Sequence, residues 1–159
     1  MKTILAPVDF SAVSDAVVAE AAALARALQG RVVLLSVVQP PVVLAEYAAM
    51  IDNIAELTVA GERNAARQLE KIEAKLAADF IEADSIQLVG EPIPVITDQA
   101  EKLNADYIVM GSHGHTALYD LLVGSTTHGV MLRAKCPMVI VPAVKSAKGK
   151  PKRKQVAAA

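Results

Sequence analysis

The chain has no tryptophan, and aromatic residues make up only 3% of its 159 residues. It also has no run of 18 or more apolar residues, which argues against a membrane-spanning helix. The first apolar run, Ile4 to Val8, ends at Asp9 and is too short for a signal peptide. We therefore expect a soluble cytoplasmic protein with no membrane partner, whose core is aliphatic, as in buried parallel sheets.

Cysteine is nearly absent, because Cys136 is the only one, which excludes an intramolecular disulfide. Its place just before an apolar run predicts a buried structural thiol. His113 and His115 lie close together, but no cysteine or acidic residue stands beside them at a ligand spacing. The sequence therefore predicts no metal site made by its own side chains.

Acidic residues are absent from one region, residues 145–159, which hold six of the 16 basic residues and no acid. The rest of the chain then has ten basic and 17 acidic residues, a net charge of −7. We expect a domain at 1–143 and a basic, disordered tail at 144–159, because the tail lacks apolar periodicity. The acidic body makes nucleic acid an unlikely partner, although the tail itself leaves contact with nucleic acid or an acidic surface open.

Apolar runs alternate with segments of helical periodicity, the pattern of a parallel α/β sheet. The predicted strands cover residues 3–8, 31–38, 86–89, 107–110 and 138–141. The predicted helices cover roughly 12–29, 55–79, 93–103 and 125–133, with a short helix in 42–53. Ser11 is the expected N-cap of the first helix, Gly30 is the glycine that stops it, and the apolar stripe of the second ends at Phe80. Asp106 is expected to help close the third helix.

Helices on both faces require the winding of such a sheet to reverse once. A doubly wound five-stranded parallel sheet satisfies this when the first and fourth strands are neighbours, in the strand order 3-2-1-4-5. Ligands bind at the carboxyl ends of the strands that flank the reversal. The ends that meet there are Val8-Asp9 and Met110-Gly111.

A glycine-rich segment, Gly111 to Thr127, follows the fourth strand. It lacks the lysine of a Walker A loop, and its glycines do not have the spacing or place of a dinucleotide fingerprint. Gly124 and three hydroxyl residues open a helix, where free N–H groups favour an anion. Turn glycines and ordinary helix caps explain the same residues, so the pattern leaves both readings open.

Gly111, Gly114, Gly124 and Ser125 match the G-x2-G-x9-G-S motif of the ATP-binding branch of the universal stress protein family. The opening segment 4–11 and the closing segment 136–142 also resemble that family. The resemblance covers residues 2 to about 142 and implies an adenine-nucleotide α-hydrolase-like fold with the strand order given above. It also implies a stress-response or regulatory module that binds ATP, ADP or AMP, with Mg²⁺ as a further ligand, and a homodimer paired through Met138 to Val141.

The resemblance also implies which residues bind the nucleotide. Adenine would lie near Pro7, Val8, Asp9 and Val37. Asp9 would accept hydrogen bonds from the base or the ribose, or else cap the first helix. Val37 would give apolar contact, or else belong only to the core. The ribose and phosphates would lie on Met110, Gly111, Ser112, His113, Gly114, Gly124, Ser125, Thr126 and Thr127.

Catalytic residues are not evident. No lysine or arginine lies between Gly111 and Val130, although enzymes of phosphoryl transfer usually place cations at the phosphates. His113 is the best-placed candidate base, but the sequence gives it no geometry. We therefore expect a binding protein with no catalytic residue. A slow ATPase or nucleotidyltransferase in the same pocket, and a dimer whose glycines are only turns, are the alternatives.

Overall fold

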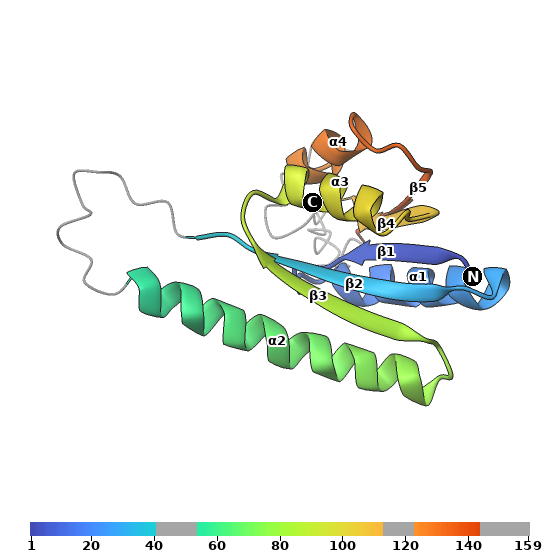
Figure 1. Cartoon of the computed structure of the whole chain (residues 1–159), viewed down its shortest axis with the longest axis horizontal. Helices are drawn as coiled ribbons and strands as arrows, with labels where there is room; N and C mark the ends of the chain where they lie inside the picture. The colour runs from blue at the N-terminus through green and yellow to red at the C-terminus, as the bar shows by residue number, and fades with distance from the viewer. Residues whose placement is uncertain (41–53, 113–122, 144–159) are drawn as a thin grey trace, which may run out of the picture.

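The computed structural model of the chain describes residues 1–40, 54–112 and 123–143. Along these residues parallel strands and helices alternate (Figure 1). In chain order they are β1 Thr3–Pro7, α1 Ser14–Leu28, β2 Arg31–Val38, α2 Ile54–Ala78, β3 Ala83–Val89, α3 Pro92–Lys102, β4 Tyr107–Gly111, α4 Ser125–Met131 and β5 Met138–Val141. The strands form one sheet in the order β3-β2-β1-β4-β5, which confirms the predicted topology.

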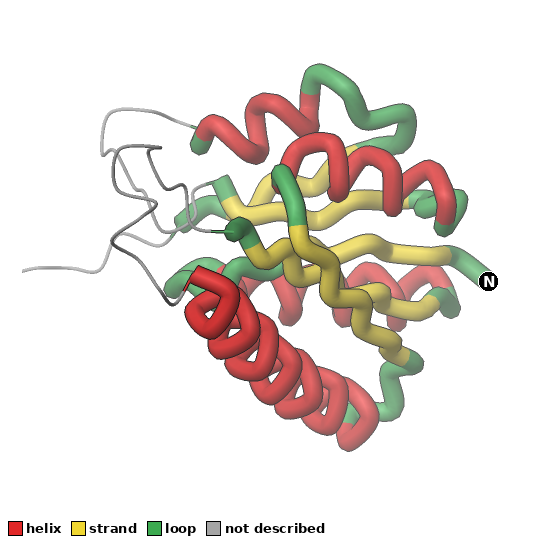
Figure 2. Tube along the Cα trace, turned by 60° about the vertical axis from the view of Figure 1, so that its left-hand side comes forward, coloured by secondary structure: helices red, strands yellow, loops and turns green. Residues whose placement is uncertain are grey.

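Helices cover both faces of the sheet (Figure 2). Because alternate residues of a strand point to opposite faces, Ile4 and Ala6 of β1 pack on the side of α1 and α2. Leu5 of the same strand packs on the other side, with α3 and α4. Among the described residues, no aromatic side chain belongs to the fully buried core. The expected doubly wound sheet with an aliphatic core is confirmed.

The ends of α1 differ from the prediction. Ser11 lies outside the helix, which begins at Ser14 after Val13, and no side chain caps its first turn. At the other end Gln29, not Gly30, takes the left-handed conformation, with φ 51°. Gly30 is required for a different reason: a Cβ there would collide with the backbone oxygen of Lys2. The glycine therefore permits a close approach of the chain and not a special backbone angle.

The end of α2 was also predicted wrongly. The helix ends at Ala78, and Phe80 lies beyond it with φ 58° and 98% of its surface exposed. Phe80 is therefore not part of the buried stripe, whereas Leu69 and Leu76 are. β3 begins at residue 83 and not at 86, because its pairing with β2 starts there, and α4 ends at residue 131 and not at 133.

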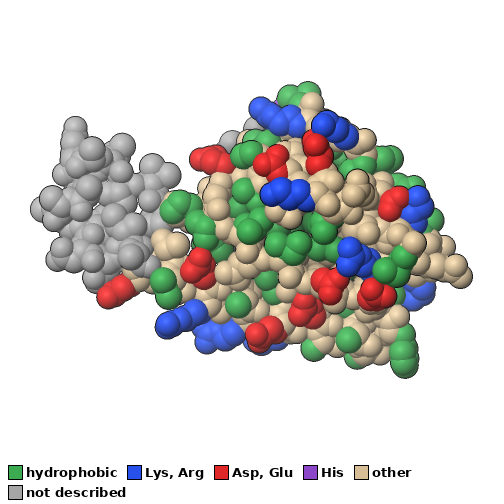
Figure 3. All heavy atoms as spheres, in the orientation of Figure 1, with side chains coloured by type: hydrophobic (Ala, Val, Ile, Leu, Met, Phe, Trp, Pro, Cys, Tyr) green, Lys and Arg blue, Asp and Glu red, His purple; other side chains and the backbone are tan. Residues whose placement is uncertain are grey.

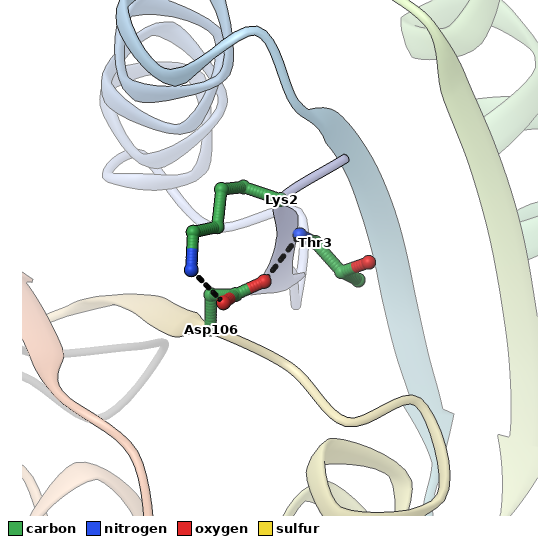
Figure 4. Close-up of polar contacts among 3 residues, drawn as sticks. All are labelled: Lys2, Thr3 and Asp106. Carbon is green, nitrogen blue, oxygen red and sulfur yellow. Dashed lines mark hydrogen bonds and ion pairs between the residues drawn. The ribbon is translucent and has the colours of Figure 1, made fainter.

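Ion pairs link neighbouring strands at the amino edge of the sheet, and Figure 4 shows one of them. Lys2 Nζ lies 2.6 Å from Asp106 Oδ1, and the Thr3 N–H donates to Asp106 Oδ2 at 2.8 Å. Asp106 was expected to close α3, but its carboxylate joins β4 to β1 instead. Arg31 of β2 pairs with Asp84 of β3 at 2.8 Å. The amino ends of these four strands are thus held by side chains as well as by the sheet.

The Lys2–Asp106 contact shifts both pKa values. The hydrogen bond from Lys2 lowers the pKa of Asp106 below its ordinary 3.8, and the Thr3 N–H acts in the same direction. The same hydrogen bond raises the pKa of Lys2 above its ordinary 10.5. Both groups are therefore charged across the neutral range.

Candidate functional site

A cavity of about 430 Å³ lies at the carboxyl ends of β1, β2 and β4, between α1, α2 and the first turns of α3 and α4. This is the edge at which the winding of the sheet reverses, where ligands of open α/β sheets bind. Its volume is within the usual range of small-molecule sites. Most of its lining is apolar, and among the described lining residues Asp9 is the only charged one. The described lining consists of Pro7, Val8, Asp9, Phe10, Val13, Ser14, Val17, Leu35, Ser36, Val37, Val38, Gln39, Gly61, Asn64, Ala65, Pro92, Ile96, Met110, Gly111, Gly124, Ser125, Thr126 and Thr127.

The predicted site residues of the described part meet in this cavity, with the exception of Ser112. Those that line it are Pro7, Val8, Asp9, Val37, Met110, Gly111, Gly124, Ser125, Thr126 and Thr127. Two further predicted residues, His113 and Gly114, lie outside the described residues. Segments about a hundred residues apart in sequence thus form opposite walls of one space.

Asp9 follows β1 and takes part in the turn that leads to α1. Its Oδ1 accepts the Ser11 N–H at 3.0 Å and the Ser14 hydroxyl at 3.1 Å. The residue is nevertheless exposed and lines the cavity. Asp9 therefore does not cap α1, the alternative role weighed for it, because the residue before the helix is Val13 and no side chain caps the first turn.

Val37 lies on β2 beyond the point where β1 stops. The register of these strands ends at Pro7↔Leu35, followed by a bond from the Val8 N–H to the Leu35 oxygen at 2.9 Å. Backbone polar groups of alternate strand residues point to the same side. The N–H and C=O of Val37 therefore point to the same side as those of Leu35, toward the cavity that begins where β1 ends. This gives Val37 a polar backbone edge in addition to its apolar side chain.

Ser112 and Thr127 join the two ends of the glycine-rich segment. The Ser112 N–H donates to the Val141 backbone oxygen at 2.7 Å, and the Ser112 backbone oxygen accepts the Gly124 N–H at 2.6 Å. The Ser112 hydroxyl accepts the Ala143 N–H at 3.0 Å. The buried Thr127 hydroxyl donates to the Gly111 oxygen at 2.8 Å. These bonds fix the end of β4 against the start of α4, so the cavity wall is built from two anchored segments.

Backbone dihedral angles do not explain why Gly111 and Gly124, which line this wall, are glycines. Gly124 has φ −66° and ψ 158°, a conformation open to any residue. Among the described glycines, Gly90 is the one with a positive φ, so Gly111 does not need one either. Backbone conformation therefore does not require glycine at either position, and what glycine contributes there is the absence of a side chain, which permits a close approach to the backbone.

The cavity residues on and beside α1, α2 and α3 were not predicted from the sequence. Ser14 and Val17 come from α1, with Val13 at its N-cap, Gly61, Asn64 and Ala65 from α2, and Pro92 and Ile96 from α3. The apolar periodicity of α1 indicated a buried face, but that signal is the same for a core and for a cavity wall. No signal was available for α2, because periodicity does not say how far a helix extends past the edge of a sheet.

The described lining offers apolar surface and hydrogen-bonding groups. The described lining has hydroxyls, backbone amides and one carboxylate, but no lysine, arginine or histidine. The first N–H groups of α4 have no partner within the helix, and Gly124 at its N-cap gives no side-chain cap. The walls can therefore enclose an apolar ring system and donate hydrogen bonds to oxygen atoms, whereas no described cation is placed to stabilise a transition state.

No group of three or more histidine, cysteine or acidic side chains among the described residues could hold a metal ion. Within the same residues, none of the helices combines the length and apolar character needed to cross a membrane. Cys136 is half-buried, and burial raises the pKa of its thiol. It lies away from the cavity and packs against the core on the α3 side.

The sequence profile of the universal stress protein family matches residues 1–142. The chain is 29% identical to universal stress protein YxiE of Bacillus subtilis over 142 residues, which cover 86% of this chain and 96% of that protein. It is 32% identical to universal stress protein Sll1654 of Synechocystis over 143 residues, covering 89% and 85%.

Solved structures show the same likeness. The structure of protein MJ0577, from Methanocaldococcus jannaschii, has a TM-score of 0.78 at 30% identity and covers 91% of this chain and 98% of that one. UspA from Lactobacillus plantarum has a TM-score of 0.80 at 27% identity, with coverage of 88% and 97%. Two more distant structures share the fold: a universal stress protein in complex with cAMP (TM-score 0.61, 21% identity) and one from Archaeoglobus fulgidus in complex with dAMP (TM-score 0.54, 21% identity).

Proposed function

Because the chain belongs to the universal stress protein family, we propose that its cavity binds an adenine nucleotide, ATP or its ADP or AMP form. The protein then acts as a nucleotide-binding module of a stress or regulatory response. The observation that carries the proposal is that Asp9, Val37 and the described glycines of the motif meet in one cavity. The complexes of two family members with cAMP and dAMP support this class of ligand.

The adenine ring fits the end of the cavity formed by β1 and β2. Its faces would pack on apolar side chains such as Val8 and Val17. Its edge carries both hydrogen-bond donors and acceptors, which suit the backbone N–H and C=O of Val37. Asp9, an acceptor when ionised, suits the amino group of the base or a ribose hydroxyl.

The ribose and phosphates fit the opposite wall. Gly111 and Gly124 leave room for them, and the exposed Ser125 and the half-buried Thr126 offer hydroxyls and amides. Thr127 is less available, because its hydroxyl proton is donated to Gly111. A bound Mg²⁺ would neutralise phosphate charge, and it favours the oxygen ligands that phosphates, water and these hydroxyls supply.

We propose binding without efficient turnover. Phosphoryl transfer depends on charge stabilisation at the phosphates, and the described walls offer no cationic side chain for it. His113, the candidate base of a slow ATPase or nucleotidyltransferase, lies outside the described residues.

Mass spectrometry of nucleotide released from the purified, denatured protein tests the ligand. We expect an adenine nucleotide. Added ATP at 100 times its dissociation constant should stabilise the nucleotide-free protein by about 2.7 kcal/mol. Incubation with Mg²⁺ and ATP should leave the ATP intact, whereas repeated turnovers would favour the enzyme. The proposal would be contradicted if the purified protein released no nucleotide and added ATP did not stabilise it.

We also propose a homodimer formed through β5, which lies at the edge of the sheet beside β4. Pro137 accepts a bond from Ile108 of β4, and Val141 accepts one from Ser112, just past the end of β4. Because backbone groups of neighbouring strand residues point to opposite sides, the N–H of Ile140 points away from β4. Ile140→Pro removes this outward donor and leaves the bonds to β4. Light scattering should then find a monomer, whereas Ile140→Val should remain a dimer. A monomeric wild-type protein would contradict this proposal.

A further inference from the structure

Donors in the turn after β1 and at the start of α1 bind the carboxylate of Asp9. The Ser11 N–H and the Ser14 hydroxyl both donate to Oδ1, at 3.0 and 3.1 Å. Phe10, which directly follows Asp9, has φ 59°, a left-handed conformation that is uncommon for a residue with a side chain. The chain therefore bends sharply after Asp9, and α1 begins close to the carboxylate.

Ser14 has an unusual role for a serine at the start of a helix. A serine there commonly accepts a bond from a helical N–H and so caps the helix. The first turn of α1 has no such side-chain bond. Ser14 is instead 7% exposed, lines the cavity, and donates its proton to a carboxylate five residues earlier. This bond does not cap α1 and instead joins Ser14 to the Asp9 carboxylate.

We infer that Ser14 is a positioning residue of the nucleotide site, whose hydroxyl sets the direction of the Asp9 carboxylate at the cavity wall. The inference rests on the proposed nucleotide function. An ionised carboxylate only accepts hydrogen bonds, so the group it meets on the ligand is a donor of the nucleoside. The adenine amino group and the ribose hydroxyls are the donors of this kind. Ser14 thus contributes to affinity through Asp9 and does not touch the ligand.

A double-mutant cycle tests this dependence by calorimetry with ATP. Ser14→Ala should weaken ATP binding about tenfold, the effect of one hydrogen bond to a charged group. The loss should vanish in an Asp9→Asn background, because the carboxylate that Ser14 orients is gone. Ser14→Thr, which keeps the hydroxyl, should bind ATP like the wild type.

Thr97→Val is the matched control. Thr97 has a buried hydroxyl on α3 that bonds to the Ile93 and Pro94 oxygens, and it does not line the cavity. Its loss should lower the melting temperature and leave ATP affinity unchanged. If Ser14→Ala and Thr97→Val both lost ATP affinity in proportion to their loss of melting temperature, Ser14 would have only a structural role. This result would overturn the inference.

Two analogues identify the donor. Inosine triphosphate lacks the amino group, and 2′,3′-dideoxy-ATP lacks the ribose hydroxyls. Ser14→Ala should no longer weaken binding of the analogue that has lost the donor. An equal effect on ATP and both analogues, or additive losses with Asp9→Asn, would overturn the positioning role while leaving nucleotide binding intact. A wild-type protein that binds no ATP would instead overturn the proposed function itself.

Discussion

The amino edge of the sheet is closed by charge pairs, whereas the carboxyl edge opens into a cavity with a single described charge. At the first edge, Lys2 and Asp106 lie 2.6 Å apart and Arg31 and Asp84 lie 2.8 Å apart. At the second, small and apolar residues surround Asp9. Side chains at the amino ends of the strands thus link neighbouring strands, whereas those at the carboxyl ends surround a cavity. The ion pairs and the proposed binding site therefore lie at opposite ends of the strands.

Two glycines mark the same contrast. Gly30 lies at the amino edge, where a Cβ would collide with the backbone of Lys2. Gly124 lies at the carboxyl edge in a conformation that any residue can adopt, beside the cavity. The first glycine is required by the folded chain itself, and we attribute the second to the ligand. Substitutions at the two edges should therefore have different consequences.

The largest expected effect is on binding at the carboxyl edge. Gly124→Val places a branched side chain where phosphates approach, so ATP affinity should fall by roughly two orders of magnitude or more, about 3 kcal/mol. The melting temperature should stay near that of the wild type, because valine tolerates the backbone angles of Gly124. Calorimetry and thermal unfolding measure the two quantities. Met131→Val, at an exposed position of the same helix, should change neither. Unaltered affinity in Gly124→Val would refute the phosphate position.

The second effect is on stability at the amino edge. Gly30→Ala forces the added Cβ against the Lys2 oxygen, which should cost about 1–3 kcal/mol of unfolding free energy, as overpacking does. Denaturant unfolding measures this loss. ATP affinity, determined well below the melting temperature, should remain that of the wild type. If Gly30→Ala weakened binding as strongly as Gly124→Val, the two edges would not be separate.

The smallest effect concerns the Lys2–Asp106 pair. Asp106→Asn removes the charge and should lower the melting temperature modestly at neutral pH. Because the folded-state pKa of Asp106 is lowered, its stabilisation is present above pH 3.8 and is lost as the pH falls through the folded value. Because the folded-state pKa of Lys2 is raised, its contribution to stability is fully present below pH 10.5. It is lost as the pH rises through the folded-state pKa.

The melting temperatures of the wild type and Asp106→Asn should therefore differ by a constant amount across the neutral pH range and become equal in acid. A difference that persists unchanged in strong acid would show that the charge of Asp106 is not what stabilises the fold. ATP binding at neutral pH should be the same in both proteins.

The sequence predicted the sheet well because its signals are long and repeated. Continuous apolar strands and helical periodicity indicated the elements, and the handedness of the crossovers restricted the strand order. Element ends were less predictable. Phe80 matches the helical period but lies past the last turn of α2, where periodicity no longer applies. The start of β3 at Ala83 follows from pairing with Val32, a contact that no local pattern announces.

The site was predictable where it rests on strand ends and on a motif. Asp9 and Gly124 were both predicted, and both line the cavity. The contribution of Asn64 was not predictable, because it depends on where α2 lies along the sheet. Nor was the Ser14–Asp9 bond, which requires the left-handed turn at Phe10. Such features arise from tertiary packing and backbone angles, which spacing in sequence does not encode.

The most direct test of the account is an amide chemical-shift titration of the ¹⁵N-labelled protein with ATP. The account predicts that the largest shifts fall at the carboxyl edge, on Asp9, Val37, Gly111 and Gly124. Amides of the amino edge, such as Thr3, should not move. Saturable shifts confined to the carboxyl edge would support a nucleotide site there. No shifts with ATP, or the largest shifts at the amino edge, would contradict it.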